Sequence, residues 1–422
     1  MLSSRHRSAS LFTIVVLATA AGLAGCGGES EDSPSIDPSF YEEVAPILAS
    51  NCSSCHKPGG IAPFSLLTYE DAKQYASLIA PAVESRRMPP WSADNSGDCH
   101  TWEGARWLSD DDIQTIAAWS RGEQIEGDPA NAPDMLPEEV GLSKVDATLD
   151  MGIEYTPDPK LADDYRCFVV DYSPATQKFL TAFEVKPGES RVVHHILFFG
   201  LDSATQVSQA ESLDAAAAGP GYTCFGGSGV NGAPLLGVWA PGVRVNRYPA
   251  NTGLKVPANG KMIIQIHYNL QAGPLPDRTT IDLELADSVT KEAFLALTAD
   301  PDLALPPGQK AIATSGVLNV PNILGAEFEV WAMYPHMHTL GTSMRVERER
   351  AGEPTECMLD VPRWDFNWQQ FFNYADGPII AKPNDAIRIT CSYNTMGRTE
   401  TVTWGEGTLD EMCLSFLYTT LR

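Results

Sequence analysis

Positively charged side chains are few in this chain. Its 422 residues contain 29 lysines and arginines against 54 aspartates and glutamates, so the formal net charge is −25 at pH 7. No cluster of basic residues interrupts this acidic composition. Because nucleic acids need cationic partners for their phosphates, we expect no nucleic-acid partner. The charge says little about the fold.

Long apolar runs are confined to the beginning of the chain. The run from Leu11 to Ala24 carries no charge and follows two arginines, an arrangement typical of export signals. The segment that ends it, Leu23-Ala-Gly-Cys26, resembles a bacterial lipobox, in which Cys26 becomes the lipid-bearing first residue. The alternative is an ordinary secretory signal. No later segment is apolar for long enough to span a bilayer.

These features predict an exported protein. We expect residues 1–25 to form a signal peptide and residues 26–36 a flexible, acidic tether. The lipid on Cys26 would attach the protein to a bacterial membrane, on its periplasmic or cell-surface face.

Unpaired cysteine should also be rare, because an exported chain generally oxidises its thiols. Of nine cysteines, Cys26 is assigned to lipid, and Cys52 and Cys55 belong to a Cys-x-x-Cys-His motif. The remaining six form an even number, as a disulfide framework requires: Cys99, Cys167, Cys224, Cys357, Cys391 and Cys413.

Histidine is scarce too, yet its positions are concentrated. Of the eight histidines, one lies in the leader and His100 stands alone. The other six occupy four short motifs: His56 in Cys-x-x-Cys-His, the pair His194-His195, His267 in Ile-His-Tyr, and His336 and His338 around Met337. Histidine is the commonest metal-ligating side chain, so this distribution predicts a redox-metal protein.

Residues 37–128 read as a small helical unit, followed by a linker over residues 129–142. We expect helices over residues 40–49 and 69–86, and a third that starts at Ser109 with a good N-cap and an acidic first turn.

The motif Cys52-Ser-Ser-Cys55-His56 is the attachment signature of c-type haem, in which His56 supplies one axial nitrogen. A thioredoxin-like redox pair is the rival interpretation, but no strand precedes the motif. Met88, in a loop stiffened by two prolines, fits the opposite axial position; the alternative is a buried core methionine. The segment resembles a small monohaem cytochrome c domain.

From about residue 143 the pattern changes to strands. Seven runs are rich in β-branched and aromatic residues, over residues 166–170, 178–185, 192–199, 261–270, 327–333, 386–393 and 412–421. Glycine- and proline-rich turns separate them and no long amphipathic helix intervenes, which predicts antiparallel sandwiches. Residues 219–241 read as a long glycine-rich loop that lacks the Lys-Ser/Thr ending of a nucleotide-binding loop.

Strand geometry bears on the histidine motifs. Residues two apart on a strand project from the same face, so His336 and His338 can share one ion. Adjacent residues point to opposite faces, so joint ligation by His194 and His195 requires a bulge, a strong twist or a strand end.

Four ordered segments carry a family resemblance: Val193-His-His-Ile-Leu-Phe-Phe199, Gln265-Ile-His-Tyr268, His336-Met-His-Thr-Leu-Gly341 and Asp410-Glu-Met-Cys413. Together they resemble the copper-ligand segments of the type II ascorbate-dependent monooxygenases. The resemblance covers roughly residues 160–422 and implies two jelly-roll-like copper domains, over residues 143–288 and 289–422.

The resemblance also implies roles for individual residues. It assigns His194, His195 and His267 to an electron-transferring copper, and His336, His338 and Met412 to a copper that activates oxygen. It implies disulfides Cys391–Cys413 and Cys167–Cys224, and parity then leaves Cys99 with Cys357.

Ligand chemistry supports this assignment independently. A thioether beside two imidazoles favours Cu(I), whereas zinc rarely takes methionine. The sequence departs from the peptidylglycine enzymes at Tyr334, where they carry an arginine that binds the substrate carboxylate. A more apolar substrate than a glycine-extended peptide is therefore expected.

The leading hypothesis is a two-copper, one-haem monooxygenase. It would act on O2 and a small organic molecule and take electrons through the haem from an external donor. The alternative is a non-catalytic electron-transfer or copper-binding lipoprotein, and a third interpretation is an adhesion or sensory module that kept only the sandwich. Intact ligands at all six copper positions disfavour the third.

Overall fold

The computed structural model describes residues 37–58, 60, 62–136, 141–172, 174–225, 227–241, 245–258, 260–405, 407 and 409–422. The expected signal peptide, the tether and the lipidated Cys26 lie outside these residues. No helix among the described residues has the length and apolar character needed to cross a membrane.

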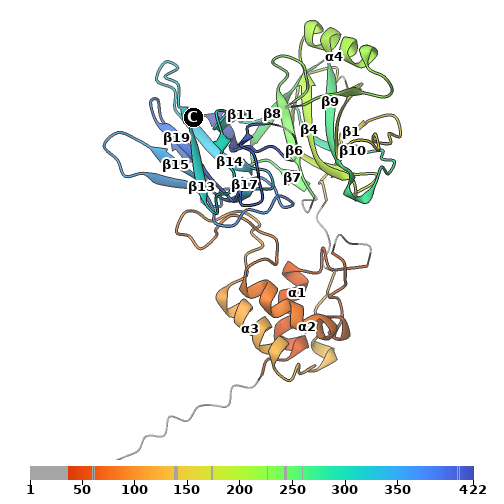
Figure 1. Cartoon of the computed structure of the whole chain (residues 1–422), viewed down its shortest axis with the longest axis vertical. Coiled ribbons are helices and arrows are strands. Elements are labelled where there is room, and N and C mark those ends of the chain that lie inside the picture. Colours follow the sequence, from red (N-terminus) through yellow and green to blue (C-terminus); the bar gives the residue numbers. More distant parts are fainter. Residues whose placement is uncertain are drawn as a thin grey trace, which may run out of the picture.

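A small helical unit forms the lower part of the molecule in Figure 1. It contains a π-helical turn Phe40–Val44, α1 (Ala45–Asn51), α2 (Tyr69–Glu84) and α3 (Asp110–Arg121). Side chains cap the two longer helices: Thr68 accepts a hydrogen bond from the Asp71 amide, and Ser109 and Asp112 form a reciprocal capping box. All three predicted helices are therefore confirmed.

The β-rich part is built from four sheets. The ten-stranded sheet contains β1 (Ala147–Asp150), β10 (Thr280–Ala286), β3 (Lys178–Lys186), β8 (Thr252–Val256), β11 (Lys291–Ala299), β21 (Leu414–Leu421), β14 (Phe328–His336) and β17 (Phe372–Asn373) in that order, with β7 (Val245–Arg247) on β3 and β18 (Ile379–Ala381) on β14. A five-stranded sheet has the order β5 (Tyr222–Thr223), β2 (Asp163–Val170), β9 (Lys261–Asn269), β4 (Val193–Leu201) and β6 (Leu235–Trp239). A four-stranded sheet contains β13 (Ile312–Asn319), β19 (Ala386–Tyr393), β15 (Gly341–Glu349) and β16 (Glu356–Val361), and β12 (Ala304–Leu305) pairs with β20 (Val402–Thr403).

Two sandwiches result, and they share one sheet. One buried core joins the five-stranded sheet to β1, β3 and β10, and a second joins the four-stranded sheet to β14 and β17. The ten-stranded sheet runs across the expected boundary at residue 288, because β8 pairs in parallel with β11. The two copper domains predicted from the sequence are thus joined edge to edge by backbone hydrogen bonds.

All seven predicted strands are present, but two local predictions were wrong. The segment predicted to be a long loop, residues 219–241, contains the short strands β5 and β6. A helix, α4 (Ala204–Ala216), interrupts the β region. The sequence did not indicate α4 because this helix has no apolar stripe: among its residues only Ala210 is buried. Short 3₁₀ turns occupy Pro129–Asn131 and Leu270–Ala272.

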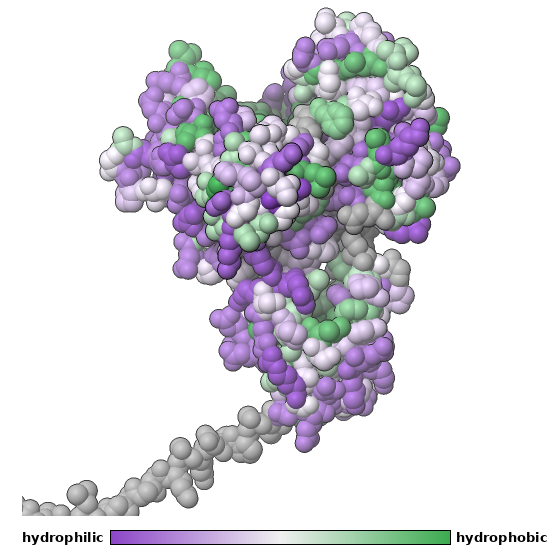
Figure 2. All heavy atoms as spheres, viewed as in Figure 1, coloured by the Kyte–Doolittle hydropathy of each residue, from purple (hydrophilic) through white to green (hydrophobic). Residues whose placement is uncertain are grey.

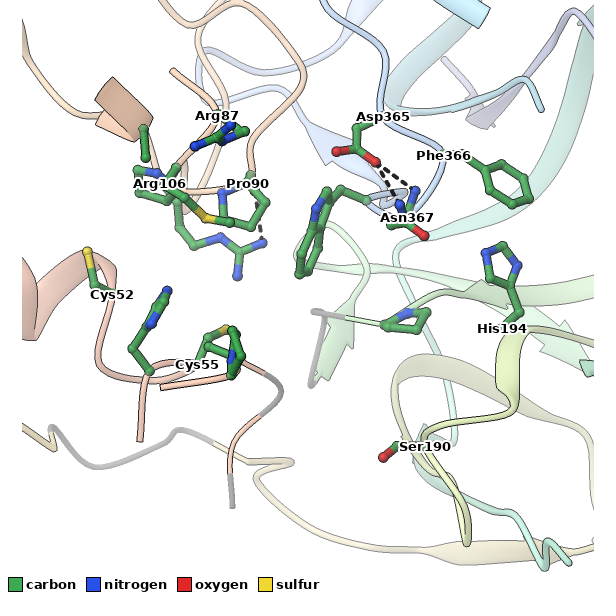
Figure 3. A pocket seen from close by; sticks show the side chains of 18 of the residues that line it. Cys52, Cys55, Arg87, Pro90, Arg106, Ser190, His194, Asp365, Phe366 and Asn367 are labelled. Atoms are coloured by element: carbon green, nitrogen blue, oxygen red, sulfur yellow. Dashed lines mark hydrogen bonds between the residues drawn. The ribbon is translucent and has the colours of Figure 1, made fainter. Parts of the chain in front are cut away.

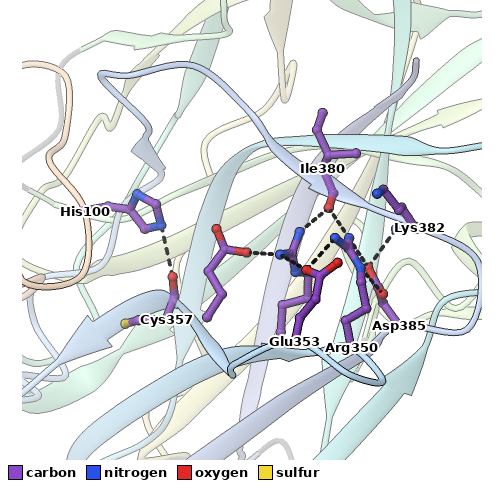
Figure 4. A network of polar contacts seen from close by, with 9 residues as sticks. His100, Arg350, Glu353, Cys357, Ile380, Lys382 and Asp385 are labelled. Carbon is purple, nitrogen blue, oxygen red and sulfur yellow. Dashed lines mark hydrogen bonds and ion pairs between the residues drawn. The ribbon is translucent and has the colours of Figure 1, made fainter.

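The segment between α2 and α3 attaches the helical unit to the second sandwich. Trp91 and Trp102 are buried in the core of the second sandwich. The Cys99–Cys357 disulfide fixes the same segment, and His100 Nε2 lies 2.9 Å from the Cys357 carbonyl (Figure 4).

Ionic contacts brace the second sandwich beside this disulfide. The Arg350 guanidinium donates two hydrogen bonds of 2.8 Å to the Asp385 carboxylate and another of 3.0 Å to the Ile380 carbonyl (Figure 4). Disulfides Cys167–Cys224 and Cys391–Cys413 also form, so all three predicted pairings are confirmed.

Candidate metal centres

Three histidines converge where β4 and β9 lie side by side. The register of this pair shifts between Val193 and His195, so the bulge that joint ligation requires is present. His195 then lies directly opposite His267. The Nδ1 atom of His195 is 3.3 Å from His194 Nδ1 and 3.2 Å from His267 Nδ1.

This cluster has the chemistry of a metal site. Burial lowers the pKa of His194 to about 3 and also lowers the pKa values of His195 and His267, so all three imidazoles are neutral, which is the ligating form. His267 Nε2 lies 2.8 Å from the Asp163 carboxylate, which orients the ring as in carboxylate–histidine–metal arrangements. His194 Nε2 is buried without a hydrogen-bond partner. A cation held among these rings would satisfy the converging nitrogens.

The second set lies at the end of β14. His336 Nδ1 is 2.6 Å from Gln369 Oε1, and His338 Nδ1 is 3.1 Å from the Asp410 carbonyl. Both contacts place a proton on Nδ1 and leave Nε2 as the ligand atom. Burial lowers the pKa of His336 to about 3 and also lowers the pKa of His338.

Glu411 ties Met412 to these histidines. Its fully buried carboxylate accepts hydrogen bonds from the backbone amides of His338 at 2.9 Å, Leu340 at 2.6 Å and Met412 at 3.2 Å. Burial raises the pKa of Glu411 to about 7, against the opposing effect of these donors. The backbone of Met412 is thereby held next to the backbone of His338.

The two ligand sets adjoin each other. The rings of His195 and His336 have centroids 6.3 Å apart. Phe366 lies between the sets, stacked on His194 at 4.5 Å and edge-on to His338 at 6.0 Å. The sequence analysis predicted both sets but not this proximity.

A cavity of about 1180 Å³ lies between the helical unit and the sandwiches (Figure 3). Cys52, Cys55, His56 and Met88 line one side of it, and His194 lines the other. Figure 2 shows hydrophobic side chains toward the centre of the helical unit, below the sandwiches, and hydrophilic ones around its outer edge. The cavity therefore brings together the motifs that were predicted separately.

The residues of this cavity fit a covalently attached haem. Cys52 and Cys55 are free thiols, and Cys52, whose pKa burial raises to about 12, is uncharged. His56 Nδ1 lies 3.1 Å from the Phe64 carbonyl, which leaves Nε2 for an axial bond. Met88 lines the same space.

Part of this chain is similar to known copper enzymes. Residues 292–419 match the model of the copper type II ascorbate-dependent monooxygenase C-terminal domain. The second sandwich is similar to this copper enzyme family. DBH-like monooxygenase protein 1 of Mus musculus is 25% identical over 303 residues, which cover 65% of this chain and 47% of that protein.

Two further relatives have names that state an activity. Tyramine beta-hydroxylase of Caenorhabditis briggsae is 24% identical over 249 residues, covering 56% of this chain and 40% of that protein. Dopamine beta-hydroxylase of Canis lupus familiaris is 23% identical over 197 residues, covering 44% and 31%. The chain spans less than half the length of these relatives. The matches support a copper-dependent monooxygenase.

Three functional contacts escaped the sequence analysis. Asp163 and Gln369 hold histidine rings, and Phe366 joins the two sets, but nothing in their local sequence distinguishes them. Glu411 could have been found, because it precedes Met412 in the Asp-Glu-Met-Cys segment.

Proposed function

We propose that this protein is an exported monooxygenase that uses two coppers and one c-type haem. It inserts one atom of O2 into a C–H bond of a small, largely apolar molecule. The observation that carries this proposal is the single cavity that reaches from Cys52, Cys55, His56 and Met88 to His194. A lipid on Cys26 would attach the protein to a bacterial membrane, and the three disulfides agree with export.

Bound copper would supply one-electron chemistry and the activation of oxygen, and bound haem would supply electron storage. The protein's own contribution is positioning. Neutral His194, His195 and His267 would hold one copper, with Asp163 orienting the last ring. His336, His338 and Met412 would hold the other, where the soft thioether favours the reduced ion.

The surroundings of Tyr334 support an apolar substrate. This residue replaces the arginine of the peptidylglycine enzymes and is 2% exposed. Its ring packs 5.1 Å from Phe371 and 6.4 Å from Phe416. A substrate carboxylate would find no cation at this position.

The electron balance explains why a haem unit would be useful. Converting RH and O2 into ROH and water consumes two electrons and two protons. An external donor would reduce the haem, which Cys52, Cys55 and His56 would hold in the cavity that His194 also lines.

Two measurements test the proposal. Metal analysis should give two coppers per chain, and His336→Ala should lose the second copper while the first remains. Oxygen uptake should depend on an added substrate in the parent and fall to background in His336→Ala. Bound metals without substrate-dependent oxygen uptake would instead favour the electron-transfer protein. Absence of bound copper would contradict both functions.

A further inference from the structure

One short segment, residues 363–369, contacts both the helical unit and the two histidine sets. Arg363 donates hydrogen bonds to the carbonyls of Ser85, at 2.8 Å, and Arg86. Three residues further along, Phe366 stacks on His194. We name residues 363–369 the bridge segment.

The same segment is fixed on the side of the second histidine set. The Trp364 indole donates a 3.0 Å hydrogen bond to the His338 carbonyl, and Gln369 contacts His336. Trp364, Phe366 and Trp368 all line the cavity (Figure 3 labels Phe366). Aromatic side chains thus cover the wall between the Cys-x-x-Cys-His motif and the metal ligands.

The cavity reaches the ligand sets at one point. Of the five histidines predicted to hold copper, His194 is the one among the described residues that line the cavity. Phe366 covers the ring of His194 at an interplanar angle of 25°. A path of packed rings from the cavity into the first histidine set therefore passes through Phe366 and His194.

The contact between the two parts is also permanent. The Cys99–Cys357 disulfide and the buried Trp91 and Trp102 attach the helical unit to the second sandwich. A freely tethered electron carrier would need none of these. The geometry suits transfer within one chain over a fixed distance.

We propose that the bridge segment is the internal electron path, in which an electron leaves the haem and enters the first histidine set through Phe366 and His194. This inference rests on the proposed function. The step is a one-electron exchange: ferrous haem becomes ferric, the cupric ion at His194 becomes cuprous, and no covalent bond changes. The electron is supplied beforehand by a chemical reductant added to the haem.

The test compares two phenylalanine substitutions. Phe366→Leu keeps an apolar side chain and removes the ring on His194. Phe225→Leu is the matched control, because Phe225 lies outside the cavity lining and reaches the same set from another side, 5.1 Å from Tyr165, which stacks on His267. Haem is reduced without oxygen, cupric ion is present in the first set, and haem oxidation is followed by absorbance.

The expected result is haem oxidation slowed about tenfold or more in Phe366→Leu, equivalent to ~1.4 kcal/mol in the barrier, and unchanged in Phe225→Leu. Direct reduction of copper by ascorbate should be equally fast in both variants. An equal rate of haem oxidation in Phe366→Leu and the parent would overturn the proposed electron path through the bridge segment. A lower rate in Phe225→Leu instead would overturn it too. Failure of the parent haem to react with bound copper would overturn the proposed haem delivery itself.

A second readout is independent of electron transfer. In the fully oxidised protein, ferric haem should shorten the electron spin relaxation time of the cupric ion. The shortening should be equal in the parent and in Phe366→Leu, because the substitution leaves the distance between haem and copper unchanged. Arg363→Gln should weaken this effect and increase hydrogen exchange over residues 85–88, because it removes the two hydrogen bonds from the bridge segment to the Ser85 and Arg86 carbonyls. A relaxation change in Phe366→Leu would mean that the ring serves only to hold the parts together, and the electron path would be wrong.

Discussion

Buried polar side chains around the ligands determine which atoms can bind metal. Each imidazole has two nitrogens, and a hydrogen bond at one leaves the other as the ligand. Gln369 and the Asp410 carbonyl make this choice for His336 and His338, and Asp163 orients His267. Glu411 acts differently, because it holds backbone amides and so fixes the positions of His338 and Met412 together.

Replacing Glu411 should therefore affect one copper selectively. The Glu411 carboxylate accepts hydrogen bonds from three backbone amides. In Glu411→Gln the side-chain NH2 group would face at least one of these N–H donors, so charge-assisted hydrogen bonds of about 1.5–3 kcal/mol would be lost. We expect copper affinity at the second set to fall about tenfold or more, with the first set unchanged, as measured by chelator competition.

Glu329→Gln is the matched control, since Glu329 is also buried on β14 but pairs with Lys291 away from the ligands. A loss at both copper sites, or none at the second, would show that Glu411 supports the fold in general and has no particular role at the ligands.

The buried histidines should also make the copper-free protein sensitive to mild acid. Burial depresses the pKa of His194 and His336 to about 3, below the value of about 6.5 in an unfolded chain. The unfolded state therefore binds more protons, and the stability that these groups contribute is complete above pH 6.5 and is lost as the pH falls toward 3. As the pH falls through that window, each such histidine lowers the free energy of unfolding by about 1.4 kcal/mol per pH unit.

Urea unfolding of the copper-free protein between pH 7 and 5 measures this effect, because most carboxylates titrate at lower pH. The double variant His194→Gln, His336→Gln should show a pH slope smaller by about 2–3 kcal/mol per unit. An identical slope in parent and variant would mean that these histidines are not held neutral by burial.

At the scale of elements, strand geometry was the predictable part. The alternating and β-branched runs gave β2, β3, β4, β9, β14, β19 and β21, and the adjacent His194 and His195 required the bulge that β4 contains. These features depend on neighbours along the chain. The Cys391–Cys413 disulfide, which joins β19 to the start of β21, came from the family resemblance instead.

Other elements could not be predicted for identifiable reasons. Helix α4 lacks an apolar stripe, so the spacing of its apolar residues does not predict a helix. The parallel pairing of β8 with β11 depends on contacts between segments about 40 residues apart, which leave no local signal. Trp91 and Trp102 lie within residues 37–128, which the sequence predicts as a helical unit, but they pack in a core with residues more than 200 positions later in the chain.

At the scale of the whole molecule, three buried parts meet around one redox region. The Cys-x-x-Cys-His motif, the first histidine set and the second set come from distant parts of the sequence, and the cavity and the bridge segment bring them together. The sequence predicted each ligand set, whereas the closeness of the two sets is a property of the folded chain. The central claim is that electrons stored at the haem position serve oxygen chemistry at the copper ligands.

Incorporation of ¹⁸O from labelled O2 into product, with electrons supplied at the haem and no ascorbate present, tests this claim most directly. The parent should place one labelled atom in each product molecule. The double variant Cys52→Ala, Cys55→Ala, which cannot hold haem covalently, should form no product under these conditions and should recover when ascorbate is added. Equal labelled product from parent and variant without ascorbate, or no labelled product from either under any reductant, would contradict the account.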